Sequence, residues 1–442
     1  MPFLDSFLAK NTSLHYSQFR KYLIVRFAVI LSLNMQMAII SYMAYKELTH
    51  DKLTLGMLGL WEVIPAIGCS LFSGHFVDLR EKKGMVLQCV LGYLLLSAFY
   101  VLLSWPVFYH KAGVGLTINL IYAGVFVGGV LRAFISPASF ALQGLLVPRK
   151  EYVNATTWSS TSWQSGFVFG NLLGGVLIAI LGYEASLISV FAMQLVALFG
   201  IVSIPKQEIH KKDKEPITKS LKQGLKFVFN TQVILAALSL DMFAVLFGGA
   251  VALLPVYAVD ILGVGEVGYG WMKAAPGIGS ILSLFILSFI PLKKNAGGKL
   301  LLAITGFGIT TIIFGVCGNI ANTQFFGSFW GCNLSWAFIL AFAMLFLGGM
   351  FDAVSVVIRG TILQLKTPDA MRGRVAAVNT MFISSSNELG ALESGLTAKW
   401  MGTVPAVLFG GCMTLVVVGV TYFAAPMLRK MKLEATSPEH KT

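Results

Sequence analysis

The chain alternates between long apolar runs and short polar connections. About twelve runs reach the roughly 20 mainly apolar residues that a helix needs to cross a bilayer. Backbone groups in lipid must be hydrogen-bonded within their own segment, and strand-like alternation of apolar and polar residues is absent, so the runs predict helices. We therefore expect an all-α integral membrane protein with twelve transmembrane helices. The runs lie near residues 21–46, 54–77, 85–105, 115–146, 153–181, 184–204, 231–259, 267–292, 299–320, 333–364, 375–399 and 404–428.

Composition and charge placement agree with a membrane protein. Hydrophobic residues make up 56% of 442 positions and charged residues 12%, against about 25% charged in soluble domains. With the amino terminus placed in the cytoplasm, 25 of the 33 Lys and Arg residues fall in cytoplasmic segments. This asymmetry is the positive-inside rule and predicts that both termini are cytoplasmic. The net charge of +13 therefore indicates topology, and we expect no nucleic-acid partner.

The longest cytoplasmic segment divides the chain into two halves. Residues 205–230 contain seven lysines and separate a predicted six-helix bundle, residues 1–204, from a second bundle with a cytoplasmic tail, residues 231–442. The second part of the segment has the pattern of an amphipathic helix on the inner membrane surface. A solvated linker is the alternative.

The two halves repeat the same sequence pattern. LWEVIPAIGCS at 60–70 and WMKAAPGIGSI at 271–281 share one template, in which Glu62 and Lys273 occupy equivalent positions at an offset of 211. LSLNM at 31–35 matches LSLDM at 238–242 and places Asn34 opposite Asp241. Equivalent segments are six helices apart, an even number, so the halves have the same orientation. This is the parallel repeat of secondary transporters with six plus six helices.

A third match links two charges near the middle of helices four and ten. Residues 128–132 correspond to 348–352 at an offset of 220, so Arg132 is opposite Asp352. A charge at this depth needs a partner or water and is a candidate functional residue. With Arg132 or Arg359 within reach, Asp352 can change its proton affinity between two states, as an antiporter requires. A structural ion pair is the alternative.

Other ionisable residues lie inside the apolar runs. Glu62 and Lys273 are about two turns inside helices two and eight, where they serve either as a titratable pair or, for Lys273, as a side chain that extends to the interface. Asp241 lies within helix seven. Glu388 and Glu393 on helix eleven are five residues apart, about 140° around the axis, so they cannot both face one cavity squarely. All are candidates for proton coupling.

Two equivalent stretches are rich in hydroxyl groups, TTWSSTSWQSG at 156–166 and NTMFISSSNELG at 379–390. Polar helix surface in a bilayer either joins helices or lines a wet cavity. Trp163 can present an aromatic face to a flat or cationic substrate. The candidates for lining a substrate cavity are Asn34, Trp163, Gln164, Asn171 and Asn387.

The loop after the second helix, GHFVDLREKKG, resembles the G-x-x-x-D-[RK]-x-G-[RK]-[RK] motif of the major facilitator superfamily. Leu79 and Glu81 depart from the motif. A carboxylate at a tight turn between helices can meet the positive amino end of a neighbouring helix and nearby cations. We expect that contact to hold the two halves together on the cytoplasmic side; a charged inner loop without this role is the alternative. The candidate residues of this conformational loop are Gly74, Asp78, Arg80, Lys82 and Lys83.

Three longer stretches, 132–148, 254–279 and 352–395, are similar to the bacterial exporter branch of that superfamily, which includes the enterobactin exporter and macrolide-efflux-type proteins. The glycines of 166–175 also resemble the antiporter motif of helix five, with Asn171 where a proline is expected, although close helix packing explains them equally. The resemblance implies a multi-pass protein of the bacterial cytoplasmic (inner) membrane.

No Walker loop, metal-ligand cluster or nucleophile–base pairing is evident in the sequence, so we expect a non-enzymatic protein without a metal or cofactor. We expect a monomer in membrane lipid that exports a siderophore-like or amphiphilic small molecule, in exchange for H⁺, by alternating access; such efflux can also confer multidrug resistance. The alternatives are uptake or facilitated diffusion of a metabolite or lysolipid, and a receptor or scaffold that transports nothing.

Overall fold

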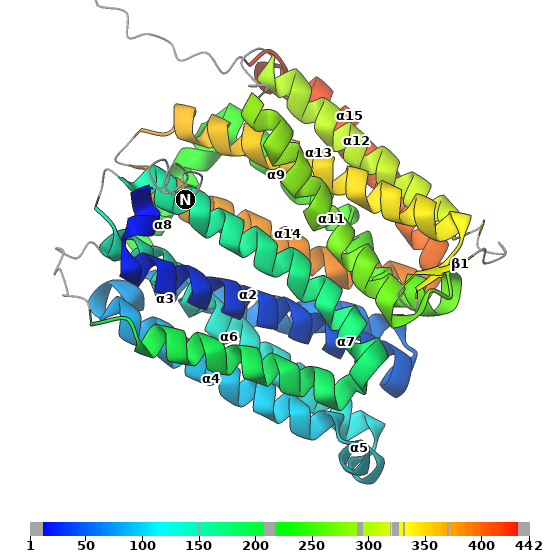
Figure 1. Cartoon of the computed structure of the whole chain (residues 1–442). Helices are drawn as coiled ribbons and strands as arrows, with labels where there is room; N and C mark the ends of the chain where they lie inside the picture. The colour runs from blue at the N-terminus through cyan, green and yellow to red at the C-terminus, as the bar shows by residue number, and fades with distance from the viewer. Residues whose placement is uncertain are drawn as a thin grey trace, which may run out of the picture. The chain divides into compact units, whose positions relative to one another are not determined.

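The computed structural model describes residues 12–148, 151–206, 217–289, 295–318, 320, 327–329, 332–368 and 371–431. These residues are almost wholly helical (Figure 1). The prediction of an all-α membrane fold is confirmed.

The amino-terminal half consists mainly of long helices, and a π-helical segment, η2, continues the first of them. The elements are η1 (Thr12–His15), α2 (Ser17–Met43), η2 (Ala44–Thr49), α3 (Lys52–Leu79), α4 (Lys82–Ser104), α5 (Pro106–Ala112), α6 (Val114–Leu146) and α7 (Tyr152–Val202).

The carboxy-terminal half has the same character, with one pair of short strands. The elements are α8 (Ile217–Asn230), α9 (Gln232–Phe247), η4 (Ala250–Leu253), α10 (Leu254–Val256), η5 (Tyr257–Ile261), α11 (Gly265–Phe289), α12 (Ala296–Cys317), β1 (Gly327–Phe329), β2 (Cys332–Leu334), α13 (Trp336–Lys366), α14 (Arg372–Met401), α15 (Thr403–Ala424) and α16 (Pro426–Arg429). β1 pairs with β2.

Nine helices of the described chain are long and apolar enough to cross a membrane. One of them, in α7, contains Gly182 at φ 74° and ψ −178°, a conformation that glycine adopts without steric cost. This break falls between the predicted runs 153–181 and 184–204. The total of twelve spans stays a prediction.

The chain forms two compact units. The first comprises Met1–Lys214, Val264–Ala274 and Ser328–Asn333, and the second comprises the remainder. The boundary after Lys214 falls within the predicted linker 205–230. The first ten residues of α11, Gly265–Ala274, therefore belong to the first unit, while the helix continues into the second.

Three glycines of α7 bring its backbone close to α2, and the two helices lie side by side (Figure 1). A methyl group at Gly166 would lie 3.1 Å from Cβ of Ile30, at Gly170 3.0 Å from Cβ of Asn34, and at Gly174 2.9 Å from Cβ of Ala38. Small residues at such spacing allow close helix packing in membranes. Packing therefore accounts for the glycine pattern, and an antiport role for it stays a prediction.

The sequence repeat reappears as a packing repeat inside each unit. In the first unit, a methyl group at Gly129 of α6 would lie 2.7 Å from Cγ of Pro65 on α3. In the second unit, a methyl group at Gly349 of α13 would lie 2.5 Å from Cα of Pro276 on α11. Equivalent prolines and equivalent glycines of the repeat thus form the same type of helix contact in both halves.

Helix α8 packs against other helices of the second unit. Val228 is fully buried in a hydrophobic cluster with residues of α9, α13 and α14. The Gln223 side chain accepts a hydrogen bond from Arg374 of α14, while Lys222 and Lys226 are exposed. Val228 of α8 therefore contacts protein, whereas Lys222 and Lys226 lie on its exposed side.

Candidate functional site

An ion pair joins α3 and α6 inside the first unit. Nη1 of Arg132 lies 2.5 Å from Oε1 of Glu62. The close contact of Gly129 with Pro65 and with the Glu62 carbonyl brings the two helices together at this level. The Arg132 side chain is 48% exposed and that of Glu62 19% exposed, although both belong to long apolar helices. Such a pair is accessible to a proton or to a solute.

Aromatic side chains link α3 and α4 to α6, the helix that carries Arg132. The ring of Trp61, next to Glu62, lies 6.4 Å from that of Tyr122 and 6.3 Å from that of Phe126 on α6. The Tyr93 hydroxyl of α4 donates to the carbonyl of Gly128, at 3.4 Å. The rings therefore add apolar packing to the helix contact that brings Glu62 and Arg132 together.

A second ion pair lies inside the second unit and is almost inaccessible. Arg359 of α13 pairs with Asp241 of α9, and their side chains are only 5% and 8% exposed. The Ser355 hydroxyl lies 3.5 Å from Oδ1 of Asp241. Removal of either partner would leave an uncompensated buried charge, which is strongly destabilising. In this conformation the pair joins α9 to α13.

The expected partners of Asp352 are engaged elsewhere, because Arg132 pairs with Glu62 and Arg359 with Asp241. Among the described residues no ion pair includes Asp352. It is half-buried on α13 and precedes Arg359 by seven residues, which places the two on one side of the helix about 10 Å apart along its axis. A proton-coupling role for Asp352 stays a prediction.

Lys273 belongs to a group of contacts between the start of α11 and the end of α2. Its ammonium donates to the Tyr269 hydroxyl at 3.2 Å, and that hydroxyl donates to the Ala38 carbonyl at 3.3 Å. The rings of Tyr42 and Tyr269 lie 5.0 Å apart. Lys273 is thus held at α2 by its neighbour one turn before it.

An ion pair that the sequence analysis missed completes this group. Nζ of Lys46, in η2, lies 2.5 Å from Oε1 of Glu266 in the first turn of α11. We call Tyr42, Lys46, Glu266 and Tyr269 the α2–α11 contact. The two charges are 220 residues apart, and no repeat or motif marks them as partners.

The acidic candidates on α14 have different surroundings. Glu388 and Glu393 are both half-buried, while Asn387 is exposed. Gly390, between them, packs against α9, where a methyl group would lie 2.9 Å from the Leu246 carbonyl oxygen. The structure therefore places the two carboxylates on either side of a tight helix contact.

The side-chain amides of Asn34 and Asn171, both candidates for the substrate cavity, donate hydrogen bonds to backbone carbonyls of their own helices. Nδ2 of Asn34 donates to the Ile30 carbonyl at 2.8 Å, and Nδ2 of Asn171 donates to the Phe167 carbonyl at 2.9 Å. Asn171 is also buried. Trp163 is exposed and Gln164 half-buried, so these two are better placed than Asn171 to meet a solute.

In the conformational loop, the lysines bind backbone carbonyls. Lys82 donates to the carbonyls of Val77 and Arg80, and Lys83 donates to that of Val202 at 3.2 Å. Glu81, which departs from the family motif, caps α4 by accepting from the backbone of Gly84 at 2.7 Å. Arg80 is exposed. The side chains of positions 74 and 78 (Gly74 and Asp78) lie outside the described part of the structure.

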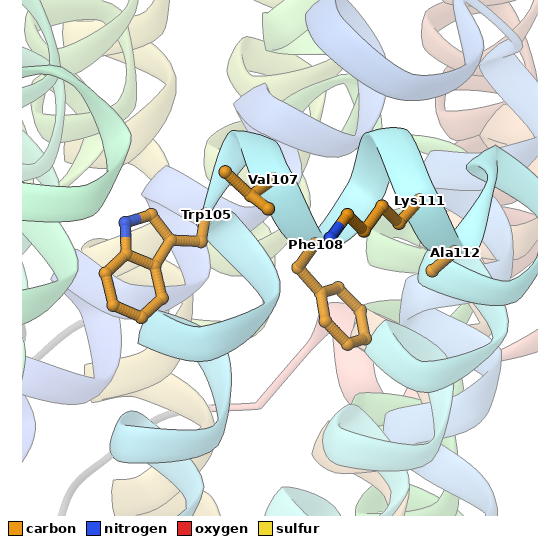
Figure 2. A pocket seen from close by; sticks show the side chains of 5 residues that line it. All are labelled: Trp105, Val107, Phe108, Lys111 and Ala112. Atoms are coloured by element: carbon orange, nitrogen blue, oxygen red, sulfur yellow. The ribbon is translucent and has the colours of Figure 1, made fainter.

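The described residues contain no group of three or more His, Cys, Asp or Glu that could hold a metal ion. Figure 2 shows a pocket of about 460 Å³ beside α5, and its lining residues are Trp105, Val107, Phe108, Lys111 and Ala112. The embedded charges are not among those residues. The pocket and the ion pairs are therefore separate features.

Comparison with known proteins identifies relatives along most of the chain. The family model described as Major Facilitator Superfamily matches residues 22–339. The uncharacterized MFS-type transporter YfiS of Bacillus subtilis is 23% identical over 395 residues, which cover 86% of each protein. The enterobactin exporter EntS of Escherichia coli O1:K1 is 23% identical over 426 residues, covering 91% of this chain and 90% of EntS.

Solved structures with the same fold include transporters of different kinds. A POT family transporter in complex with 5-aminolevulinic acid superimposes with a TM-score of 0.69 at 12% identity, covering 93% of this chain and 96% of that one. A D-xylose-proton symporter superimposes with a TM-score of 0.68 at 12% identity, covering 96% and 99%. At this identity the similarity concerns the fold.

Proposed function

Because the chain belongs to the Major Facilitator Superfamily, we propose that it is a secondary active transporter that exports a siderophore-like or amphiphilic small molecule in exchange for protons. It works as a monomer by alternating access in a bacterial inner membrane, with both termini in the cytoplasm. The name of its relative EntS, an enterobactin exporter, supports the cargo class and the direction.

The observation that carries this proposal is the exposed ion pair of Glu62 and Arg132 in apolar helices. Arg132 pairs with the Glu62 carboxylate while the site is empty. A proton, or a substrate group that donates hydrogen bonds, then competes with Arg132 for the carboxylate. Competition for one carboxylate produces exchange, because proton and substrate cannot occupy it together.

The Asp241–Arg359 pair has a structural role in this proposal. Its two side chains are almost inaccessible, so neither exchanges a proton with water in this conformation. Asp352, Lys273, Glu388 and Glu393 remain candidates for further steps of coupling, and all are half-buried.

Transport into proteoliposomes under an imposed pH gradient tests the proposal. The purified protein is tested with a panel of siderophores and drugs, and movement of at least one compound should depend on the gradient. Glu62→Gln removes the exchangeable proton but keeps the side-chain volume, so it should abolish gradient-driven movement and leave counterflow between equal substrate pools. Glu184→Gln, a matched loss of charge outside the ion pair, should have no effect.

Three results would contradict the proposal. Substrate movement that is independent of the gradient would exclude proton exchange. Full gradient coupling in Glu62→Gln would remove Glu62 from the mechanism. Substrate accumulation in the same direction as proton flow would indicate symport and would reverse the proposed direction.

A further inference from the structure

The first part of α7 has two different sides. One side packs against α2: the Ser159 carbonyl accepts a hydrogen bond from Nε of Arg26 at 3.0 Å, and the Ser162 hydroxyl donates to the Leu23 carbonyl at 3.0 Å. Gly166 continues this side. The contacts recur every three or four residues, as expected for one side of a helix.

The neighbouring side of α7 carries exposed polar and aromatic groups. Thr156, Ser160 and Trp163 are all exposed, and with Phe167 they follow the spacing i, i+4, i+7 and i+11 of a single helical stripe. Trp163 is 41% exposed. Its ring lies 5.6 Å from that of Phe167 and only 12° from parallel. We call these two rings the Trp163–Phe167 stack.

The stripe begins with polar side chains. Its first member, Thr156, lies within hydrogen-bonding distance of the buried Gln143 side chain of α6, with Nε2 and Oγ1 3.4 Å apart. Polar helix surface in a bilayer either packs on another helix or lines water. Since Thr156 and Ser160 are exposed, no helix of the described chain covers them, and the Trp163–Phe167 stack continues the same uncovered stripe.

We propose that the Trp163–Phe167 stack is a subsite that binds a planar aromatic group of the transported molecule. Phe167 supports one Trp163 face, so the indole ring is held in place before the ligand arrives. Aromatic rings prefer parallel-displaced or edge-on contacts with a second ring, and the exposed part of Trp163 supplies the surface for one. This inference rests on the proposed function and adds a substrate class to it.

The other half of the chain lacks this stack. At the repeat offset of 220, Trp163 corresponds to Ile383 and Phe167 to Asn387. Asn387 is exposed on α14. The equivalent stripe is therefore aliphatic and polar, and the aromatic preference comes from the first unit alone.

Binding to the full-length protein in detergent tests the subsite without any gradient. The probes are ethidium, Nile red and N-phenyl-1-naphthylamine, all planar aromatic dyes, and tetrabutylammonium is the non-aromatic competitor. Trp163→Ala should weaken dye binding roughly three- to tenfold, which corresponds to the loss of one aromatic pair. Trp163→Phe should stay within about twofold of the wild type, and Trp400→Ala, another exposed tryptophan, should not change binding.

Several outcomes would overturn the subsite. They are a wild type that binds none of the three dyes, a Trp163→Ala variant that binds them normally, and a Trp163→Ala variant that loses tetrabutylammonium to the same extent. Thermal unfolding of each variant establishes that it is folded, and Trp163→Phe preserves most of the packing. If dyes bind through Trp163 but nothing moves under a pH gradient, the subsite stands and the proposed exchange fails. If exchange works and Trp163→Ala binds dyes normally, only the subsite is wrong.

Discussion

Replacement of one partner of the Asp241–Arg359 pair should destabilise the protein much more than replacement of both. The pair is 5% and 8% exposed, so a single substitution such as Asp241→Leu leaves a buried guanidinium without its counter-charge. The expected loss in the free energy of unfolding is about 3–5 kcal/mol. The double variant Asp241→Leu/Arg359→Met removes both charges and should lie within about 1 kcal/mol of the wild type, because apolar groups of similar volume commonly replace a buried pair without loss.

Chemical unfolding in detergent, followed by tryptophan fluorescence, measures these differences for both single variants and the double variant. Glu62→Gln serves as the comparison. Its ion pair is partly exposed, and exposed pairs contribute about 0–1 kcal/mol. Losses that simply add in the double variant would refute the reasoning, as would a loss at Asp241 no larger than that at Glu62.

Three further predictions concern contacts elsewhere in the first unit. Lys46→Glu should slow transport because it places two carboxylates together in the α2–α11 contact, and the exchanged pair Lys46→Glu/Glu266→Lys should restore most of the rate. Initial transport rates in proteoliposomes test this, and an exchanged pair as slow as the single variant would contradict a role for the ion pair. Gly174→Leu should lower the yield of folded protein and reduce the free energy of unfolding by about 1–3 kcal/mol, since even a methyl group would lie 2.9 Å from Cβ of Ala38. Gly115→Leu is the matched control, because nothing lies within 4 Å of a methyl group there. Size-exclusion chromatography and thermal unfolding compare the two variants, and equal losses at both sites would count against close packing. Glu81→Ala should lower the free energy of unfolding by about 1 kcal/mol through the lost cap of α4, whereas Arg80→Ala beside it should not. Thermal unfolding compares the two variants, and equal stabilities would show that the Glu81 side chain does not stabilise α4.

The ends of several helices could be predicted closely from apolar length alone. The predicted run 115–146 corresponds to α6, Val114–Leu146, and 85–105 corresponds to α4, Lys82–Ser104. The bilayer imposes one dominant rule, burial of apolar residues in hydrogen-bonded helices, so hydropathy determines where each helix lies. The predicted run 231–259 corresponds to the span Gln232–Ile261. Within this span α9 ends at Phe247, just before Gly248 and Gly249, and η4, α10 and η5 follow.

The partners of the embedded charges could not be predicted. The repeat places Arg132 opposite Asp352, yet Arg132 binds Glu62 on the adjacent helix of its own unit. A repeat shows which positions are equivalent, whereas ion pairing depends on which helices pack together and on side-chain reach. The role of Glu81 could not be predicted either. This residue departs from the family motif, yet its side chain caps α4.

The glycine contacts between α2 and α7 set a limit on how the first unit can deform. Gly166, Gly170 and Gly174 bring two backbones together over about two helical turns, and any sliding by part of a turn would drive side chains of one helix into the main chain of the other. The two helices therefore move together as one rigid body. A disulfide or crosslinker placed across this seam would not impede turnover, so it offers a rigid reference from which spectroscopic labels on other helices can report displacement.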